Sequence, residues 1–418
     1  MTDQAEAPRD EGQSISRARR RELGIVATLS LCWGLALFDI IGIDFLMPFI
    51  GPNLKLNNTQ IGLLFSLYWL PFGLSSYVTG ELTDRLGKPR TLLLVAMLLF
   101  SIGSVLPGLT TSFTALLMTR LLMGLLAGPI LPLAQTIVAI ECPAERRGVD
   151  MGIVQNVGTS MFGFFEPILL VAIAVRWDWR VGFFVVVIPG LIGAALVALL
   201  VRRDPAPKAV DSTGGESLPR GRRGIREVLR YRNVWLCVVA ASLFTAFVLI
   251  GRGYLPLVYV QLRHMSPQRM GILLSVLSVS GLALGVLFPA LADRIGRKPA
   301  AVLSSLLGAV FPLAGLYYAG PDVVLGALMF IGWAPAGASI LFLATIPAES
   351  VPPHSISTAI GLTFAIGTLV GGFLGPALAG WSADRWGLPS SLLVEAACAV
   401  AMAVIALALV ETKPRKAA

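Results

Sequence analysis

Six charged residues lie inside long apolar stretches of this 418-residue chain. They are the acids Asp39, Asp44, Glu166 and Glu395 and the bases Arg120 and Arg252. An ionised side chain at the centre of a membrane-spanning helix costs about 2.5–3.5 kcal/mol, so such residues normally face a water-filled cavity or one another. Because a buried carboxyl can exchange a proton and a guanidinium can bind a carboxylate, the set predicts a site for anions and protons.

Glu166 stands where an internal repeat has a glycine. Residues 158–167 (GTSMFGFFEP) align with 367–376 (GTLVGGFLGP), which sets Glu166 opposite Gly375. Packing alone does not require a carboxyl at this position. We expect Glu166 to take up a proton on the outer side and release it on the inner side. Hydrogen bonding to the substrate and a purely structural role are the alternatives.

Arg120 lies close to the membrane midplane, about nine residues or ~14 Å from the outer end of its span. Its guanidinium fork fits a carboxylate and therefore favours an anionic substrate. The alternative is that Arg120 only neutralises Asp39 or Glu166. The predicted substrate-binding residues are Arg120, Arg252, Asp39, Tyr68, Gln135 and Trp333, although aromatic residues in membrane spans more often serve packing.

Asp44 and Arg252 occupy equivalent positions in the two halves of the repeat, each four residues before a proline. We hypothesise that they form an outer gate, paired when the site faces the cytoplasm and separated when it opens outward. A permanent ion pair is the alternative. Asp44 and Asp39 are further candidates for proton coupling beside Glu166, whereas we expect Glu395 to have a partner at the outer interface.

Twelve apolar segments position these residues. Each reaches the ~20 residues that a helix needs to cross a bilayer, and the runs are continuous rather than alternating, which excludes a closed β-barrel. With 56% hydrophobic and 14% charged residues, an ordinary soluble enzyme is excluded as well. The predicted spans are 23–50, 61–80, 91–109, 112–140, 151–175, 181–201, 233–262, 271–291, 300–320, 323–347, 356–381 and 388–410.

The chain matches itself at an offset of 209 residues, which carries Asp84 to Asp293. Residues 80–89 recur at 289–298, and residues 61–66 recur at 270–275. Two homologous six-helix bundles with a pathway between them are therefore predicted, as in many secondary transporters. The predicted parts are an N-terminal tail 1–22, a bundle 23–201, a linker 202–232, a bundle 233–410 and a tail 411–418.

Lys and Arg concentrate in the segments that would face the cytoplasm if the N-terminus is inside. These segments hold most of the 33 basic residues, which predicts that both termini are cytoplasmic and that the protein lies in the inner membrane. The net charge of +9 follows from this bias and gives no reason to expect a nucleic-acid partner. We expect a monomer in the lipid bilayer.

The motif Gly80-x3-Asp84-Arg85-x-Gly87-Lys88-x-Arg90 resembles the signature of the major facilitator superfamily between its second and third spans. A weaker copy begins at Pro289. The resemblance covers nearly the whole chain and implies a cytoplasmic latch, in which the Asp caps a helix of the other half and the Arg pairs nearby. The implied gating residues are Gly80, Asp84, Arg85, Gly87, Lys88, Arg90, Asp293 and Arg294, in addition to Asp44 and Arg252.

Two further patterns resemble parts of this superfamily. In Arg120-x3-Gly124-x3-Gly128, two glycines four residues apart make a flat face that a neighbouring helix can approach closely. Asp39 lies nine residues before Pro48, as in the anion:cation symporter and the aromatic acid:proton symporter families. Position 40 is Ile rather than the Arg of the first family, and position 36 is Ala rather than the Asp of the second. The resemblance therefore supports an organic-acid symporter without choosing between these families.

The leading prediction is a secondary transporter that takes up an organic anion (an aromatic, sugar or other carboxylic acid) with protons by alternating access. A proton-driven efflux antiporter for drugs or metabolites is the alternative, disfavoured because Glu166-Pro167 replaces the Gly-Pro that antiporters have on the fifth span. A receptor or lipid-modifying enzyme is a more distant alternative. The sequence has neither a phosphate-binding loop nor a cysteine and histidine pattern typical of metal sites, so no catalytic activity, metal or cofactor is predicted.

Overall fold

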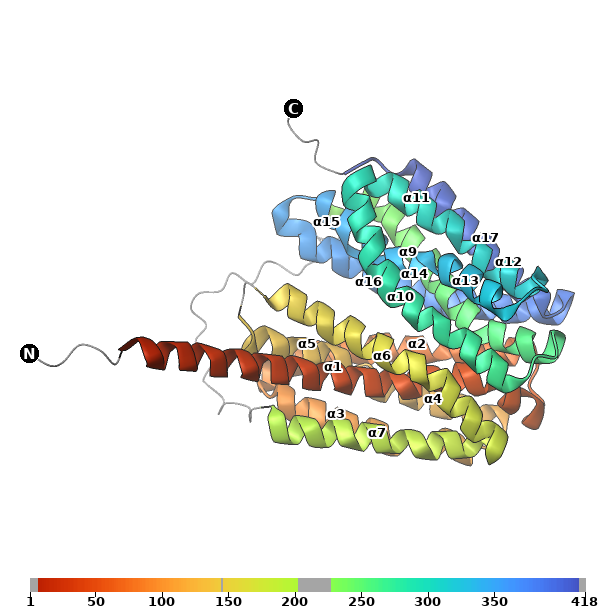
Figure 1. Ribbon diagram of the computed structural model, residues 1–418, viewed down its shortest axis with the longest axis horizontal. Helices are drawn as coiled ribbons and strands as arrows, with labels where there is room; N and C mark the ends of the chain where they lie inside the picture. Colours follow the sequence, from red (N-terminus) through yellow and green to blue (C-terminus); the bar gives the residue numbers. More distant parts are fainter. Residues whose placement is uncertain (1–6, 144–145, 202–226, 413–418) are drawn as a thin grey trace, which may run out of the picture.

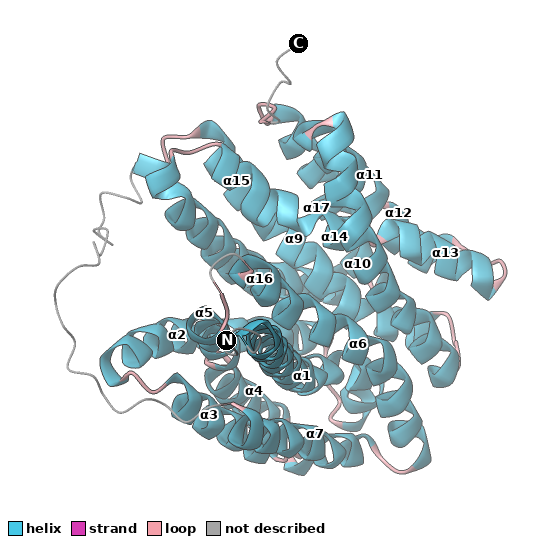
Figure 2. Cartoon of the chain, turned by 60° about the vertical axis from the view of Figure 1, so that its left-hand side comes forward, coloured by secondary structure: helices cyan, strands magenta, loops and turns pink. Residues whose placement is uncertain are grey.

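Helices make up all the regular structure in the described part of the chain. The computed structural model describes residues 7–143, 146–201 and 227–412. Within these ranges Figure 2 shows helices and loops only. Twelve segments are long and apolar enough to cross a membrane, which confirms the predicted all-α membrane fold.

The first half of the chain supplies six of the spans. Its helices are α1 (Ala7–Asn53), α2 (Asn58–Leu86), α3 (Pro89–Gly103) with a 3-10 turn (Leu106–Leu109), α4 (Phe113–Ala127), α5 (Ile130–Glu141), α6 (Arg147–Arg176) and α7 (Trp179–Leu200). The helices α4 and α5 together form one span. They meet at Gly128-Pro129, where the proline has no N–H to continue the hydrogen-bond ladder.

The second half supplies the other six. Its helices are α9 (Arg232–Leu257) with a π-helical end (Val258–Leu262), α10 (Pro267–Ile295), α11 (Arg297–Gly308), α12 (Val310–Tyr317), α13 (Asp322–Gly332), α14 (Ala334–Ile340) with a π-helical segment (Leu341–Thr345), α15 (Ile346–Glu349), a 3-10 turn (Pro353–Ser355), α16 (Ile356–Trp386) and α17 (Pro389–Ala408). The break between α13 and α14 at Trp333 comes two residues before Pro335. It interrupts one membrane span, and Trp333 lies between the two helices rather than within either.

The two halves form two helical layers. Figure 1 shows α1 to α7 in the lower layer and α9 to α17 in the upper layer. The layers meet where α2 packs on α16, α6 packs on α10 and α1 packs on α9. The predicted pair of six-helix bundles is thereby confirmed.

The close helix packing predicted for Gly124 and Gly128 is also confirmed. A Cβ atom added at Gly124 would lie 2.3 Å from the carbonyl oxygen of Tyr68, and one at Gly128 would lie 2.4 Å from that of Phe72. Real side chains do not tolerate these distances. The two glycines therefore let α4 and its C-terminal end lie directly against the backbone of α2.

The helix α1 begins at Ala7, well before the apolar run predicted from residue 23. Residues 9–22 are rich in Arg and Glu, which are good helix formers, and the proline at position 8 falls in the first turn, where it is tolerated. Most of the polar segment expected to be an N-terminal tail is thus helical.

A polar contact joins the two halves where α2 begins and α16 ends. The carboxylate of Asp384 accepts hydrogen bonds from the backbone N–H groups of Asn58 (2.9 Å) and Thr59 (2.8 Å) and from the Thr59 hydroxyl (2.5 Å). The Tyr254 hydroxyl lies 3.1 Å and 3.2 Å from the carbonyl oxygens of Asn58 and Pro376. We call this contact the outer clamp, because the basic-residue bias predicts that this end faces outward.

The N-terminus of α2 stabilises the carboxylate of the outer clamp. The first N–H groups of α2 have no partner within their own helix, and a carboxylate at a helix N-terminus satisfies them and is favoured by the helix dipole. Here the carboxylate comes from the opposite half of the protein. Separating the halves at this end therefore leaves both Asp384 and the start of α2 without these partners.

We expect Asp384→Ala to raise the population open at the predicted outer end about two- to thirtyfold, since replacing a capping carboxylate by alanine costs about 0.5–2 kcal/mol. The measurement is the labelling rate of a cysteine placed at Leu274, in a variant without native cysteines, by a membrane-impermeant maleimide. Asp178→Ala is the matched control, because Asp178 caps α7 within one half by accepting a hydrogen bond from Arg180 N–H (2.8 Å). Equal labelling rates in both variants would contradict a clamp between the halves.

Candidate functional site

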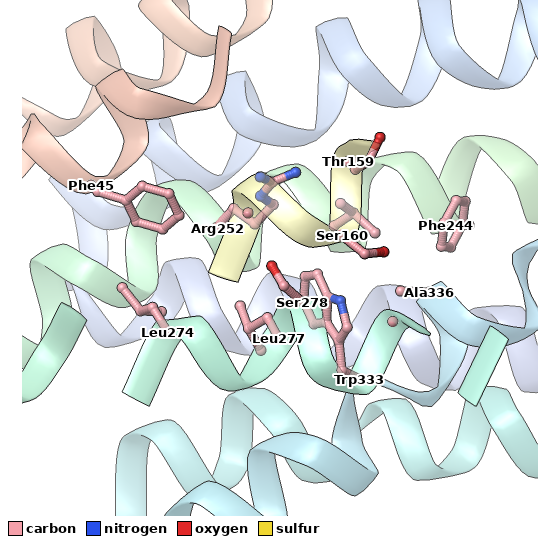
Figure 3. A pocket seen from close by; sticks show the side chains of 13 residues that line it. Phe45, Thr159, Ser160, Phe244, Arg252, Leu274, Leu277, Ser278, Trp333 and Ala336 are labelled. Carbon is pink, nitrogen blue, oxygen red and sulfur yellow. The ribbon is translucent and has the colours of Figure 1, made fainter. Parts of the chain in front are cut away.

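A cavity of about 200 Å³ lies between the two halves. Both halves contribute to its wall, as expected for the predicted pathway. The lining residues are Phe45 of α1; Thr159, Ser160 and Gly163 of α6; Phe244, Val248 and Arg252 of α9; Leu274, Leu277, Ser278 and Gly281 of α10; and Trp333 and Ala336 at the break between α13 and α14 (Figure 3).

Arg252 supplies the charge in this lining. In Figure 3 its guanidinium lies above Ser278 and the indole of Trp333. Among the described residues, no acid lies within 4.0 Å of the guanidinium and no hydrogen bond to it is formed. A guanidinium in this situation has its forked N–H donors available for a carboxylate.

Two buried carboxyls lie within electrostatic reach of Arg252. They belong to Asp44, which is 8% exposed, and Glu166, which is 1% exposed. Glu166 also interacts electrostatically with Asp44 and Asp39, and its Oε1 is buried without a hydrogen-bond partner in the described structure. Because charges in a low-dielectric region interact strongly, a charge change at any of these groups alters the energies of the others.

The hypothesised gate pair, Asp44 and Arg252, is close enough to interact but forms no ion pair within 4.0 Å in the described conformation. Arg252 faces the cavity instead. The outer clamp is formed in this conformation, so the expected gate contact is not made at an end that is already closed, and the gate stays a prediction.

Arg120 does not line this cavity. Its guanidinium carbon lies 4.4 Å from the centre of the Tyr68 ring, and Asp39, which interacts with it electrostatically, accepts a 2.6 Å hydrogen bond from the Ser104 hydroxyl. All three predicted residues, Arg120, Asp39 and Tyr68, are at most 4% exposed inside the first half. This arrangement matches the alternative that Arg120 neutralises Asp39, because α4 directs Arg120 toward α1 and α2 instead of toward the second half.

The other two predicted substrate-binding residues differ from each other. Trp333 lines the cavity, whereas the amide of Gln135 contacts that of Gln155 (3.5 Å) away from the lining. The sequence reasoning missed Phe45, Ser160 and several other lining residues. Ser160 and Gly163 are three residues apart and so share one face of α6, a spacing that could have indicated them.

The described contacts of the predicted latch lie within single halves. Arg85 pairs with Glu81 on α2, and Arg90 donates a 2.6 Å hydrogen bond to the carbonyl oxygen of Ala198. In the second copy, Asp293 pairs with Arg297. Lys88 is exposed, Arg294 keeps its place at the end of α10, and the structure describes the backbone of Asp84 but not its side chain.

The two latch glycines differ in role. Gly87 ends α2 in the left-handed region, with φ at 63°, which a residue with a side chain rarely adopts. A Cβ at Gly80 would meet nothing within 4 Å, so this position is not closely packed in the described conformation.

The partner predicted for Glu395 is not found, and that prediction is wrong. Glu395 is 0% exposed on α17, and neither carboxyl oxygen has a hydrogen-bond partner in the described structure. It lies against α9 at Gly251, where an added Cβ would be 2.3 Å from its Oε1. Burial between two packed helices keeps Glu395 away from the interface where a partner was expected.

Comparison with known families agrees with this architecture. Residues 29–372 match the model of the Major Facilitator Superfamily. This chain belongs to the Major Facilitator Superfamily. The family consists of transporters and not enzymes, so the protein is a secondary transporter with twelve membrane spans.

Several distant relatives in the Major Facilitator Superfamily have names that refer to organic acids or related metabolites, while another is named a multidrug export protein. The hexuronate transporter of Bacillus subtilis is 29% identical over 56% of this chain, and the match spans about half (54%) of that relative. The probable 4-methylmuconolactone transporter of Cupriavidus pinatubonensis is 24% identical over 81% of this chain and 79% of its own length. The gentisate transporter of Corynebacterium glutamicum is 23% identical over 89% and 85%.

A solved structure supports the same fold. A bacterial homolog of the human lysosomal transporter Spinster, in an inward-facing and occupied conformation, aligns with a TM-score of 0.74 at 20% identity. The alignment covers 92% of this chain and 96% of that chain. At this identity the likeness shows the fold alone.

Proposed function

We propose that this transporter takes up an organic anion together with protons. The observation that carries the proposal is the position of Arg252, which lines the cavity between the halves with the buried carboxyls of Asp44 and Glu166 within electrostatic reach. The names of the relatives, which include hexuronate and gentisate transporters, support an organic acid as the cargo.

The charges around the cavity give a physical reason for coupling. Three buried carboxyls (Asp39, Asp44 and Glu166) interact electrostatically with two guanidiniums (Arg120 and Arg252), and of these five groups Arg252 lines the cavity. With all five ionised, this group already has one excess negative charge. An entering anion adds a second in a low-dielectric region, which is costly unless a carboxyl takes up a proton.

Proton binding and anion binding therefore favour each other. Linkage is reciprocal, so a bound proton raises the affinity for the anion and a bound anion raises the affinity for the proton. Glu166 is the proposed proton carrier, because it is the most deeply buried of the three carboxyls and its Oε1 has no hydrogen-bond partner in the described part of the chain. Asp39 and Asp44 are the proposed secondary proton sites.

The proposed mechanism is alternating access, and the contacts between the halves support it. The outer clamp closes one end in the described conformation. Opening that end admits the anion to Arg252, with Asp44 and Arg252 separated in that state and paired when the site faces the cytoplasm, while the latch around Asp84 closes the other end. We further propose that both termini are cytoplasmic, that the protein lies in the inner membrane and that it works as a monomer.

Uptake by purified protein in liposomes tests this proposal. With an acidic exterior and a neutral interior, we expect a labelled organic acid to accumulate above its external concentration, and a protonophore to abolish the accumulation. Protein-free liposomes control for passive entry of the protonated acid. An efflux antiporter would instead lose preloaded substrate under this gradient, and that outcome would replace uptake with the alternative function.

A further inference from the structure

We propose that the cavity selects a monocarboxylate that carries hydroxyl groups, with its carboxylate on Arg252 and its hydroxyls on Ser160 and Ser278. This inference rests on the proposed function, since it specifies the class of anion taken up. Its support comes from the charge of the lining, from two serines whose hydroxyls have no hydrogen-bond partner in the described part of the chain, and from the size of the cavity.

The lining favours a single carboxylate. Arg252 is the charged residue in the cavity wall. The carboxyls that interact with it electrostatically, Asp44 and Glu166, are buried. A second carboxylate on the ligand would lie in the field of these two buried acids without a second cation in the lining. The electrostatic cost of that arrangement disfavours a dicarboxylate.

Ser160 and Ser278 face the cavity from opposite halves of the protein. Ser160 lies on α6 and Ser278 lies on α10, and both are half-buried. A serine in the middle of a helix commonly donates its hydroxyl to a carbonyl of the preceding turn. Ser275, on the same helix as Ser278, does so to Ile272 at 2.7 Å.

The two cavity serines depart from this pattern. Among the described residues, neither Ser160 nor Ser278 has a hydrogen-bond partner for its hydroxyl, whereas the neighbouring Thr159 donates to the carbonyl oxygen of Gln155 at 2.6 Å. Figure 3 shows Ser160 on the α6 ribbon and Ser278 directly below Arg252. A ligand held by Arg252 thus has two unused hydroxyls within its surroundings, each able to donate and accept.

The remaining lining suits a compact ligand. The rings of Phe45, Phe244 and Trp333 provide apolar faces around the polar groups. The volume of about 200 Å³ lies below the ~300–1,000 Å³ of typical ligand pockets. A hydroxylated acid with one ring or one short chain fits both the size and the mixed polarity.

The test compares acids that differ in their hydroxyl groups. The probes are a hexuronate against cyclohexanecarboxylate and 4-hydroxybenzoate against benzoate, each measured as kcat/KM for uptake into proteoliposomes. We expect the hydroxylated acid to be preferred in both pairs or in the hexuronate pair. Ser160→Ala and Ser278→Ala should each lower kcat/KM for the hydroxylated acid about three- to tenfold and leave the other acid unchanged.

The unhydroxylated acid reports in the same sample whether each variant folds and transports. Ser275→Ala is the matched control, since its hydroxyl bonds within its own helix and does not line the cavity. Equal preference for both acids, or equal losses for both in the serine variants, would overturn the inference and leave proton-coupled anion uptake standing. If none of the four acids is transported, the proposed function fails together with the inference.

Discussion

Replacing Arg252 by Lys is expected to raise the KM for the transported anion about ten- to 150-fold. Lysine keeps the positive charge but loses the planar fork that binds a carboxylate through two N–H groups, and hydrogen bonds to charged groups contribute about 1.5–3 kcal/mol. Arg252→Ala removes the charge as well and should abolish saturable uptake. Initial rates in proteoliposomes, normalised to folded protein, measure both effects.

Arg120→Lys is the matched control for this experiment. Arg120 packs on the Tyr68 ring inside the first half and does not line the cavity. We therefore expect its replacement to change KM less than twofold, while the melting temperature falls because the stacked guanidinium is lost. A large rise in KM for Arg120→Lys with none for Arg252→Lys would indicate that Arg120 binds the carboxylate of the transported anion, as predicted from the sequence.

Replacing Glu166 by Gln is expected to abolish proton-driven accumulation while exchange of labelled for unlabelled anion continues. One proton moved per anion allows about tenfold accumulation per unit of pH difference, because one pH unit corresponds to 1.36 kcal/mol. Gln cannot carry that proton, so the variant should reach about equal concentrations inside and outside. Parallel accumulation and counterflow assays at a two-unit gradient make a roughly 100-fold difference measurable.

Glu395→Gln provides the control for a buried carboxyl as such. Glu395 is as deeply buried as Glu166, but it lies between α9 and α17 and outside the cavity lining. Its replacement should leave accumulation intact. The assignment of the proton to Glu166 would have to be withdrawn if the Glu166 variant accumulated the anion normally or if both variants lost accumulation equally.

The fold could be predicted from the sequence because its signals are local or repeated along the chain. Twelve continuous apolar runs, a repeat at an offset of 209 residues and the motif at 80–90 sufficed to predict the superfamily and the two bundles. The glycine pair at 124 and 128 indicated a close helix contact, which the structure contains. Such features follow from hydrophobicity and residue size, which a single helix expresses in its own sequence.

The tertiary structure decided which of the buried charged residues line the cavity. The sequence identified Asp39, Asp44, Arg120, Glu166 and Arg252 as a set, but the direction in which each side chain points depends on helix rotation and on the neighbouring helices. Arg120 faces α1 and α2, whereas Arg252 faces the cavity. Rotation about a helix axis is fixed by packing between helices, so residue spacing alone does not reveal it.

The outer clamp is a second feature that could not be predicted from the sequence. Asp384 lies 326 residues from Asn58, and nothing in either local sequence indicates that a carboxylate of one half caps a helix of the other. The sequence by itself determined that this chain forms a two-bundle membrane transporter with ionised groups in its interior. Only the tertiary structure decided which of these groups face the cavity and which contacts join the halves, because both depend on surfaces that come together after the helices have formed and packed.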